Sequence, residues 1–182
     1  MQSRYYLLLL AAWLLNAPAA AQLEYHPYFG LFSGDAQISL IGDDDGVDVF
    51  DGQRYAVGLD VLVGAGQLAP SVGLLFRPGR YESPTAEPFS RHRLQLPLGL
   101  AYRVLPPAFD INLVPSVAII PGLALGDGVG EDRSVDWSGR IGIRLCIDWF
   151  TCGAHYFRTF TDPFPGGEHE AGRVLYTVGA RF

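Results

Sequence analysis

Among the residues of the chain that could do chemistry, the two cysteines form the first candidate set. Cys146 and Cys152 are its only cysteines, and they flank a tight link between two expected strands. Directly opposed residues on one face of an antiparallel pair lie close enough for a disulfide. We therefore predict one here, in an oxidising compartment. The alternative is two free thiols, because regular hairpin geometry strains such a bond. Two cysteines without an adjacent histidine pair do not predict a metal site, and no cofactor is expected.

A second candidate is the acidic run at residues 42–52, Gly-Asp-Asp-Asp-Gly-Val-Asp-Val-Phe-Asp-Gly. Its carboxylates, among them Asp43, Asp44, Asp45 and Asp48, could bind a divalent cation weakly. The spacing of an EF-hand calcium loop is not met, and the bidentate glutamate of such a loop is absent. A solvated acidic loop is therefore the simpler interpretation.

A third set consists of arginines and aspartates that alternate with apolar residues. Every basic residue of the chain is arginine, and Gly, Ala and Ser share the arginine face of the alternating segments. Small residues leave room for guanidinium–carboxylate pairs, and buried charges persist only when they are paired. We predict an interior ion-pair network built from Asp60, Arg93, Arg103, Asp110, Asp136, Arg140 and Arg144.

The elements that must position these residues are strands. Side chains at every second position of a strand share a face, and eight segments show this alternation. They are residues 25–33 (continuing to 41 after a parity change), 53–64, 70–80, 93–104, 109–125, 134–149, 151–161 and 172–182. Strands of about 9–11 residues are long enough to cross a membrane at a tilt.

The links between these segments alternate in length. Those after the second, fourth and sixth segments are short, whereas those after the first, third, fifth and seventh are longer and rich in Asp, Glu, Gly and Pro. Short periplasmic turns and long extracellular loops are typical of outer-membrane β-barrels. The prediction is an all-β protein, an eight-stranded antiparallel up-and-down transmembrane β-barrel with both termini in the periplasm.

The alternative is a barrel in water, such as a lipocalin-like one, with apolar side chains inside. The polar faces are too small and too rich in arginine for an ordinary solvated surface, which favours the membrane barrel. The interior of an eight-stranded barrel is just wide enough for side chains, so no continuous water pore is expected.

The first residues predict a cleaved signal peptide. Arg4 precedes an almost wholly apolar run from Tyr5 to Leu15, and small residues at Ala19 and Ala21 indicate cleavage after Ala21. A membrane anchor is the alternative, but the run is short for a span of about 20 residues. The expected organisation is a signal peptide at 1–21 and one barrel domain at 22–182, of 182 − 21 = 161 residues.

Charge excludes one class of partner. The expected mature chain has 12 basic and 19 acidic residues, a net charge of −7 against −6 for the full chain. A nucleic-acid-binding protein needs a basic surface, so no nucleic acid is expected.

The last segment carries a resemblance. Val174, Tyr176, Val178, Ala180 and Phe182 occupy alternate positions up to the final residue. This segment resembles the closing strand of bacterial outer-membrane β-barrels, which implies that Tyr176 and Phe182 belong to the signal read by the barrel-insertion machinery. The mature chain as a whole resembles the small barrels of the OmpA transmembrane-domain, OmpX and OmpW kind. That resemblance implies an integral, monomeric outer-membrane protein in contact with lipid and lipopolysaccharide.

The seventh segment partly resembles the lipid A 3-O-deacylase barrels. These carry a lipid-facing His-x-Ser pair and a glutamate from the last hairpin. The resemblance implies His155 as base with Glu168 or Glu170 as acid, facing lipid if Cys152 points inward. The serine position is Phe157, so the hydroxyl nucleophile is missing.

The leading hypothesis is a non-enzymatic barrel with a structural or surface-interaction role and acidic extracellular loops. A deacylase-like enzyme and a narrow conduit or binding site for small apolar molecules are the alternatives. His26 is expected at the surface or rim. Aromatic residues that include Tyr25, Tyr28, Trp149 and Phe182 are expected near the periplasmic interface.

Overall fold

The computed structural model describes residues 22–33, 37–41, 47–52, 54–84, 87, 89–90, 92–125, 135–161 and 172–182. The predicted signal peptide, Asp43 to Asp45, Glu168 and Glu170 lie outside these residues. Within the described ranges, no helix has the length and apolar character needed to cross a membrane.

The described residues fold into strands only. They are β1 (Leu23–Phe32), β2 (Gln37–Ile41), β3 (Val47–Gly52), β4 (Tyr55–Val63), β5 (Leu68–Arg77), β6 (Arg80–Glu82), β7 (Phe89–Ser90), β8 (His92–Gln95), β9 (Leu98–Tyr102), β10 (Ile111–Leu125), β11 (Val135–Ile147), β12 (Phe150–Thr159) and β13 (Arg173–Ala180).

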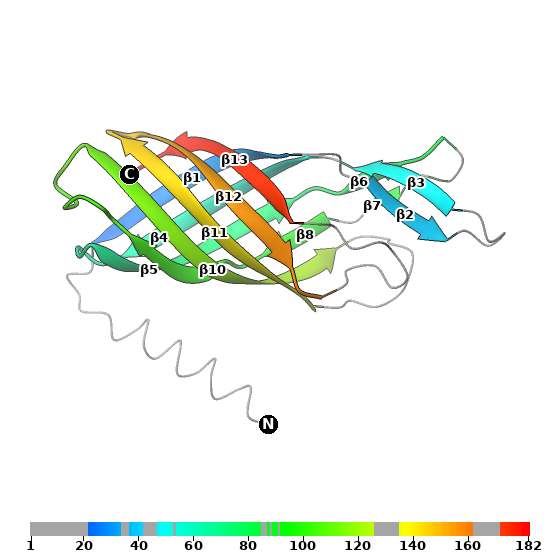
Figure 1. Ribbon diagram of the computed structural model, residues 1–182, viewed down its shortest axis with the longest axis horizontal. Coiled ribbons are helices and arrows are strands. Elements are labelled where there is room, and N and C mark those ends of the chain that lie inside the picture. The colour runs from blue at the N-terminus through cyan, green and yellow to red at the C-terminus, as the bar shows by residue number, and fades with distance from the viewer. Residues whose placement is uncertain are drawn as a thin grey trace, which may run out of the picture.

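The larger sheet closes into a barrel (Figure 1). Strand β1 pairs with β4 on one side and with β13 on the other, and every neighbouring pair around the wall is antiparallel. Strands β8 and β9 act as one interrupted strand, since both pair with β5 and with β10. Counted this way, the described residues form eight wall strands, and the predicted eight-stranded antiparallel β-barrel is confirmed.

The interruption between β8 and β9 falls at Leu96 and Pro97. Proline has no N–H to donate to a ladder. The wall is nevertheless continuous here, because Leu96 N donates to Pro121 O at 2.9 Å and Gly73 N donates to Pro97 O at 2.8 Å. Strand β10, in contrast, runs unbroken from Ile111 to Leu125 although it contains Pro115 and Pro121.

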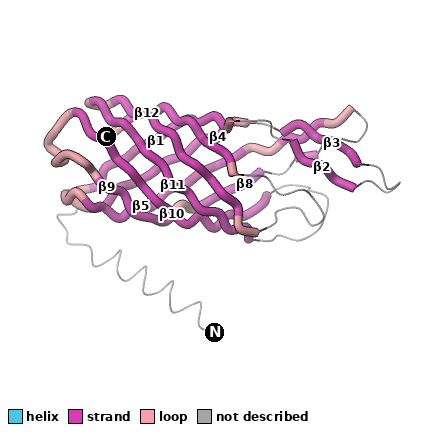
Figure 2. Tube along the Cα trace, viewed as in Figure 1, coloured by secondary structure: helices cyan, strands magenta, loops and turns pink. Residues whose placement is uncertain are grey.

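A second, smaller sheet extends beyond one end of the barrel, in the order β2-β3-β6-β7 (Figures 1 and 2). The hairpin β2–β3 continues the connection between β1 and β4, and β6 and β7 belong to the connection between β5 and β8. Two of the connections that the sequence predicts as long loops therefore contain ordered strands.

The end of the barrel opposite this sheet carries the short turns and the two ends of the wall. Tyr25 and Phe182 exchange two backbone hydrogen bonds of 3.0 Å, and Arg181 N donates to Trp149 O at 2.7 Å. These bonds bring the start of β1, the end of β13 and the β11–β12 turn together. We call this the turn end, and the end with the second sheet the loop end.

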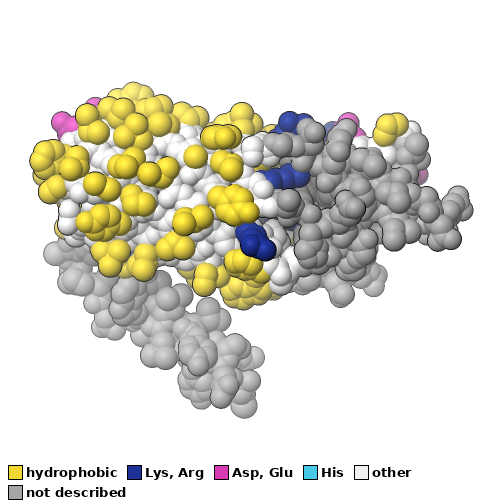
Figure 3. Space-filling view, in the orientation of Figure 1, with side chains coloured by type: hydrophobic (Ala, Val, Ile, Leu, Met, Phe, Trp, Pro, Cys, Tyr) yellow, Lys and Arg dark blue, Asp and Glu magenta, His cyan; other side chains and the backbone are white. Residues whose placement is uncertain are grey.

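The two faces of the wall have opposite polarity. Outward side chains are apolar and exposed, as in Leu31 (53%) and Ile141 (62%), whereas the inward side chains of Asp60 and Arg140 are 2% and 4% exposed. Figure 3 shows hydrophobic side chains over the visible barrel face, with patches of arginine where this band ends toward the loop end. This arrangement is the reverse of the usual one, in which charged residues are almost never fully buried.

Candidate functional site

A buried carboxylate lies between two guanidinium groups at the centre of the barrel. Asp60 comes from β4, and Arg140 and Arg144 come from β11, where their spacing of four residues puts both on one face. Arg140 Nη2 donates to Asp60 Oδ1 at 3.2 Å, and Arg144 Nη2 donates to Asp60 Oδ2. All three side chains are almost fully buried. Because each guanidinium contacts the carboxylate, we call these residues the Asp60 triad.

Small residues in the wall make room for the triad and its neighbours. Arg140 Nη1 lies 3.5 Å from the hydroxyl of Tyr28, whose ring lies beside Gly58 on the next strand. A Cβ atom at Gly58 would overlap this ring, and one at Gly73 would overlap the Asp60 carboxylate. Gly58 and Gly73 therefore make room for the inward side chains of the residues paired with them on the neighbouring strands.

A second ion pair lies nearer the turn end. Arg103, directly after β9, donates to Glu24 Oε2 through Nε at 3.0 Å and through Nη2 at 2.7 Å. Its Nη1 also donates to the carbonyl of Gly66 at 2.6 Å. His26 Nε2 lies 2.9 Å from the other oxygen of Glu24. The Arg103 guanidinium thus binds both the Glu24 carboxylate and a carbonyl of the β4–β5 turn, which stabilises this end of the barrel.

A third pair lies nearer the loop end. Arg93 Nε on β8 is 3.8 Å from Asp136 Oδ2 on β11, and both side chains are buried. The interior thus contains ion pairs at three levels along the axis. Each of these interior carboxylates is paired with one or two guanidinium groups, as buried charges require.

The structure places all of the predicted interior residues except Asp110 inside the barrel. Asp110 is exposed at the turn end, where its carbonyl accepts a hydrogen bond from Asp148 N at 2.6 Å. It precedes the first residue of β10, so the alternation of that strand does not fix its orientation. The prediction for Asp110 was wrong for this reason.

Sequence reasoning missed the contribution of β1 to the interior. Glu24, His26 and Tyr28 point inward, and His26 and Tyr28 are 0% and 5% exposed. The expectations of a rim position for His26 and an interfacial one for Tyr28 are therefore corrected. The alternation that indicates this orientation was present in the sequence, because these three residues occupy every second position. The structure shows Tyr25 and Phe29, which lie at the alternate positions, exposed on the outer face.

The predicted disulfide is not formed, and both thiols are free. A turn of two residues, Asp148 and Trp149, places Cys146 opposite Thr151 and Cys152 opposite Leu145. Cys146 is fully buried, and Cys152 lies on the other face of the wall. The prediction assumed a link of three residues, which would have paired the two cysteines. Asp148 allows the shorter turn by adopting a left-handed conformation with φ of 53°.

The same change of register reverses the orientation of His155. It is 1% exposed and points inward with Phe157, not toward lipid. Gly142 on β11 makes room for its ring, since a Cβ there would overlap the imidazole. The lipid-facing base of the deacylase comparison is therefore absent at His155. The proposed acids Glu168 and Glu170 fall outside the described residues.

In the described part of the chain, no group of three or more His, Cys, Asp or Glu residues is arranged to hold a metal ion. Asp48 lies in β3 opposite Leu40. Asp43, Asp44 and Asp45 fall outside the described ranges, so weak cation binding by the acidic run stays a prediction.

Comparison with protein-family models and with curated proteins gives no match. Among solved structures, the chain is similar to Ail, the attachment invasion locus protein of Yersinia pestis, with 15% identity, a TM-score of 0.49 and coverage of 87% of this chain and 98% of that one. A structure of Ail in complex with the heparin analogue sucrose octasulfate matches with 12% identity and a TM-score of 0.49, over 88% and 99% of the two chains. The eight-stranded fold itself is established by the strand pairing of the present chain.

Proposed function

We propose that this chain is an integral β-barrel protein of the bacterial outer membrane with a structural or surface-interaction role. The observation that carries the proposal is the reversed polarity of the wall. Leucine, isoleucine and valine side chains are exposed around the barrel, while the Asp60 triad is buried inside it. Proteins in water rarely expose contiguous apolar patches larger than a few hundred Å². Hydrocarbon around the wall removes this cost, and a closed barrel satisfies every backbone group in lipid.

The arrangement of the two ends supports an orientation. The turn end, which holds both ends of the wall, would face the periplasm, and the loop end would face outward with the small β2-β3-β6-β7 sheet. Acidic residues of the long connections would then lie at the cell surface. Lipopolysaccharide and other outer-membrane lipids are the proposed partners, and a monomer is the proposed state.

Delivery to the membrane would use the two segments singled out in the sequence. A signal peptide at 1–21 would direct export and be removed. Tyr176 and Phe182 are 57% and 74% exposed on the outer face, where the barrel-insertion machinery could contact them. We therefore propose both as parts of the insertion signal.

Substitutions on the outer face distinguish lipid from water. Leu74 on β5 is 48% exposed near the middle of the strand, and Leu68 is 61% exposed at its first residue, toward the turn end. In a membrane, Leu74→Arg should destabilise the barrel by about 2–4 kcal/mol and Leu68→Arg by only about 0–1 kcal/mol. In water, both exposed sites should tolerate arginine within about 0.5 kcal/mol.

The experiment begins with expression of the full chain in a Gram-negative host. We expect the protein in the outer-membrane fraction, resistant to carbonate extraction, with Gln22 as its first residue. Urea unfolding in lipid vesicles, followed by heat-modifiable gel mobility, then measures the two arginine variants. Recovery in the aqueous fraction without detergent, or equal stability of the two variants and the wild type, would overturn the proposal.

A further inference from the structure

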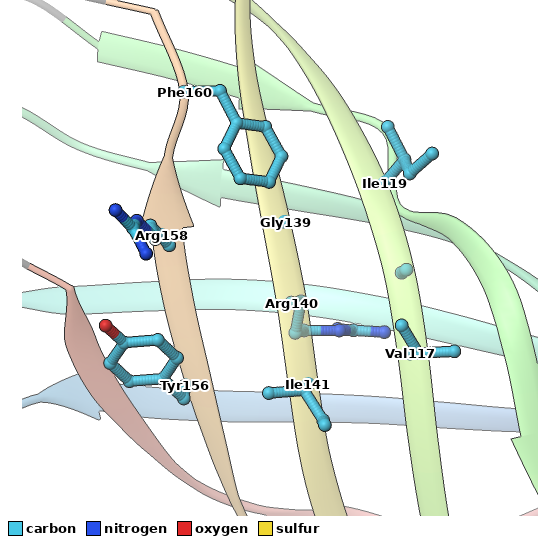
Figure 4. Close-up of a pocket in the computed structure, with 9 residues that line it drawn as sticks. Val117, Ile119, Gly139, Arg140, Ile141, Tyr156, Arg158 and Phe160 are labelled. Carbon is cyan, nitrogen blue, oxygen red and sulfur yellow. The ribbon is translucent and has the colours of Figure 1, made fainter.

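The outer face of the barrel has a hollow across β10, β11 and β12, with a volume of about 300 Å³. Its walls are apolar: Val117 and Ile119 come from β10, Ile141 from β11, and Phe160 directly follows β12 (Figure 4). Such a volume is at the lower end of the range for ligand pockets, about 300–1,000 Å³. It can hold part of a flexible chain but not a whole lipid.

The floor of the hollow is a glycine. Gly139 follows inward-facing Ser138 and precedes inward-facing Arg140, so the missing side chain of Gly139 would point outward. The ring of Phe160 lies over this position, where a Cβ atom would come within 2.7 Å of it (Figure 4). A larger residue here would fill the hollow and push the ring aside.

Two arginines border this apolar surface, inward-facing Arg140 and exposed Arg158. Arg158 lies opposite Gly139 in the β11–β12 ladder and is exposed, because it alternates with buried Phe157 on β12. It lies in the half of β12 nearer the loop end. Under the proposed orientation, this is the half of the wall in the outer leaflet. A guanidinium group beside an apolar groove matches a molecule that has both an anionic group and a hydrocarbon chain.

We propose that this hollow binds one acyl chain of a phosphorylated outer-leaflet lipid, lipid A, while Arg158 pairs with a phosphate of the same molecule. The site deepens the proposed function and depends on it, because the hollow meets lipid only if the barrel lies in the outer membrane. The apolar walls favour a hydrocarbon chain over a polar ligand. Arg158 selects the phosphorylated form over a neutral lipid, since a bidentate guanidinium–phosphate pair is lost without the phosphate.

The probe is hexa-acylated lipid A with both phosphates, added to the purified full-length barrel in detergent and detected by native mass spectrometry. Dephosphorylated lipid A is the matched ligand control. We expect a one-to-one complex that is retained about tenfold better with the phosphorylated lipid, which corresponds to about 1.4 kcal/mol.

Three variants test the residues. Arg158→Gln should lower retention of the phosphorylated lipid about tenfold and leave the dephosphorylated lipid unchanged. Gly139→Leu should lower retention of both lipids, because it fills the hollow. Arg80→Gln removes the same charge on β6, where Arg80 Nε contacts Glu82 at 2.9 Å, and should change neither.

All variants are compared after recovery from the outer membrane with folded gel mobility. If the wild type does not reach that membrane, the proposed function itself fails. If it does, but Arg158→Gln retains lipid A as the wild type does, the lipid site alone is refuted. Equal retention of the two lipids by the wild type would refute it as well, and both measurements are independent of whether Gly139→Leu folds.

Discussion

Replacing Asp60 with asparagine keeps the size of the side chain but removes the carboxylate that contacts both Arg140 and Arg144. At the 3.2 Å separation of Arg140 Nη2 and Asp60 Oδ1, this charge pair contributes about 5 kcal/mol of gross attraction, for an effective dielectric constant of about 20. Desolvation of the carboxylate offsets part of this energy. Removing one partner of a buried pair typically costs about 3–5 kcal/mol, because the other charge stays buried without compensation. We expect Asp60→Asn to reach the upper half of that range, since two guanidinium groups lose their partner.

The assay is urea unfolding of the barrel in lipid vesicles, with the folded fraction read from heat-modifiable gel mobility. With a dependence on urea of about 2 kcal/mol per molar, a loss of about 4 kcal/mol lowers the midpoint by about 2 M. Asp136→Asn should cost less, because the guanidinium of Arg93 lies 3.8 Å from the Asp136 carboxylate, farther than either guanidinium of the triad lies from Asp60.

A triple variant separates charge from packing. Asp60→Leu combined with Arg140→Met and Arg144→Met removes all three charges and keeps the interior filled. Replacing a buried ion-pair set by apolar residues of similar volume is often neutral or stabilising, so this variant should recover most of the stability lost by Asp60→Asn. If Asp60→Asn unfolds within about 0.5 kcal/mol of the wild type, or if the triple variant is as unstable as the single one, the electrostatic account of the triad is refuted.

Other predictions follow from the packing and register of the wall. Gly58→Ala should destabilise the barrel by about 1–3 kcal/mol, because the new methyl group overlaps the Tyr28 ring; Gly66→Ala, whose Cβ would meet nothing closer than a carbonyl at 3.6 Å, is the control and should unfold like the wild type. In the folded protein, a maleimide should label half-buried Cys152 faster than fully buried Cys146, and non-reducing peptide mapping should find no link between them; a cross-linked peptide would show that the register is different. In planar bilayers the wild type should give no steady conductance, because the triad and its neighbours occupy the interior, and a stable open channel would contradict that packing.

Alternation was sufficient to predict the fold and the inner face of β11. Arg140 and Arg144 share parity with Asp136 and Cys146, and all four are buried as expected. The same rule failed on β12, because parity transfers across a hairpin only when the turn length is known. The structure has two residues in that turn, and no residue pattern indicates beforehand that Asp148 takes the left-handed conformation. A shift of one residue then moved His155 from the expected lipid face to the interior.

The ion-pair and hydrogen-bond partners on distant strands were harder to predict than the face of the wall on which each side chain lies. The sequence supplied the arginines and aspartates of the interior, but the choice among them depends on the tilt and stagger of the wall. Glu24, which pairs with Arg103, and Tyr28, which contacts Arg140, are far from their partners in the chain. The separate sheet that contains β2 and β3 was also not predicted. The residues of β2 were assigned to a continuation of the first segment, and those of β3 to the acidic loop.

The seam where β13 meets β1 has a consequence for how the protein is made. It places Phe29 opposite Val178 and Leu31 opposite Tyr176, residues from the first and the last strands of the wall. Until β13 has been synthesised, the edge of β1 that pairs with it has unpaired N–H and C=O groups beside apolar side chains, and other polypeptides can bind there. Such edges are templates for aggregation. The incomplete barrel therefore needs a chaperone in any aqueous compartment until β13 pairs with β1. A chain that lacks its last strand should stay bound to that chaperone and be degraded.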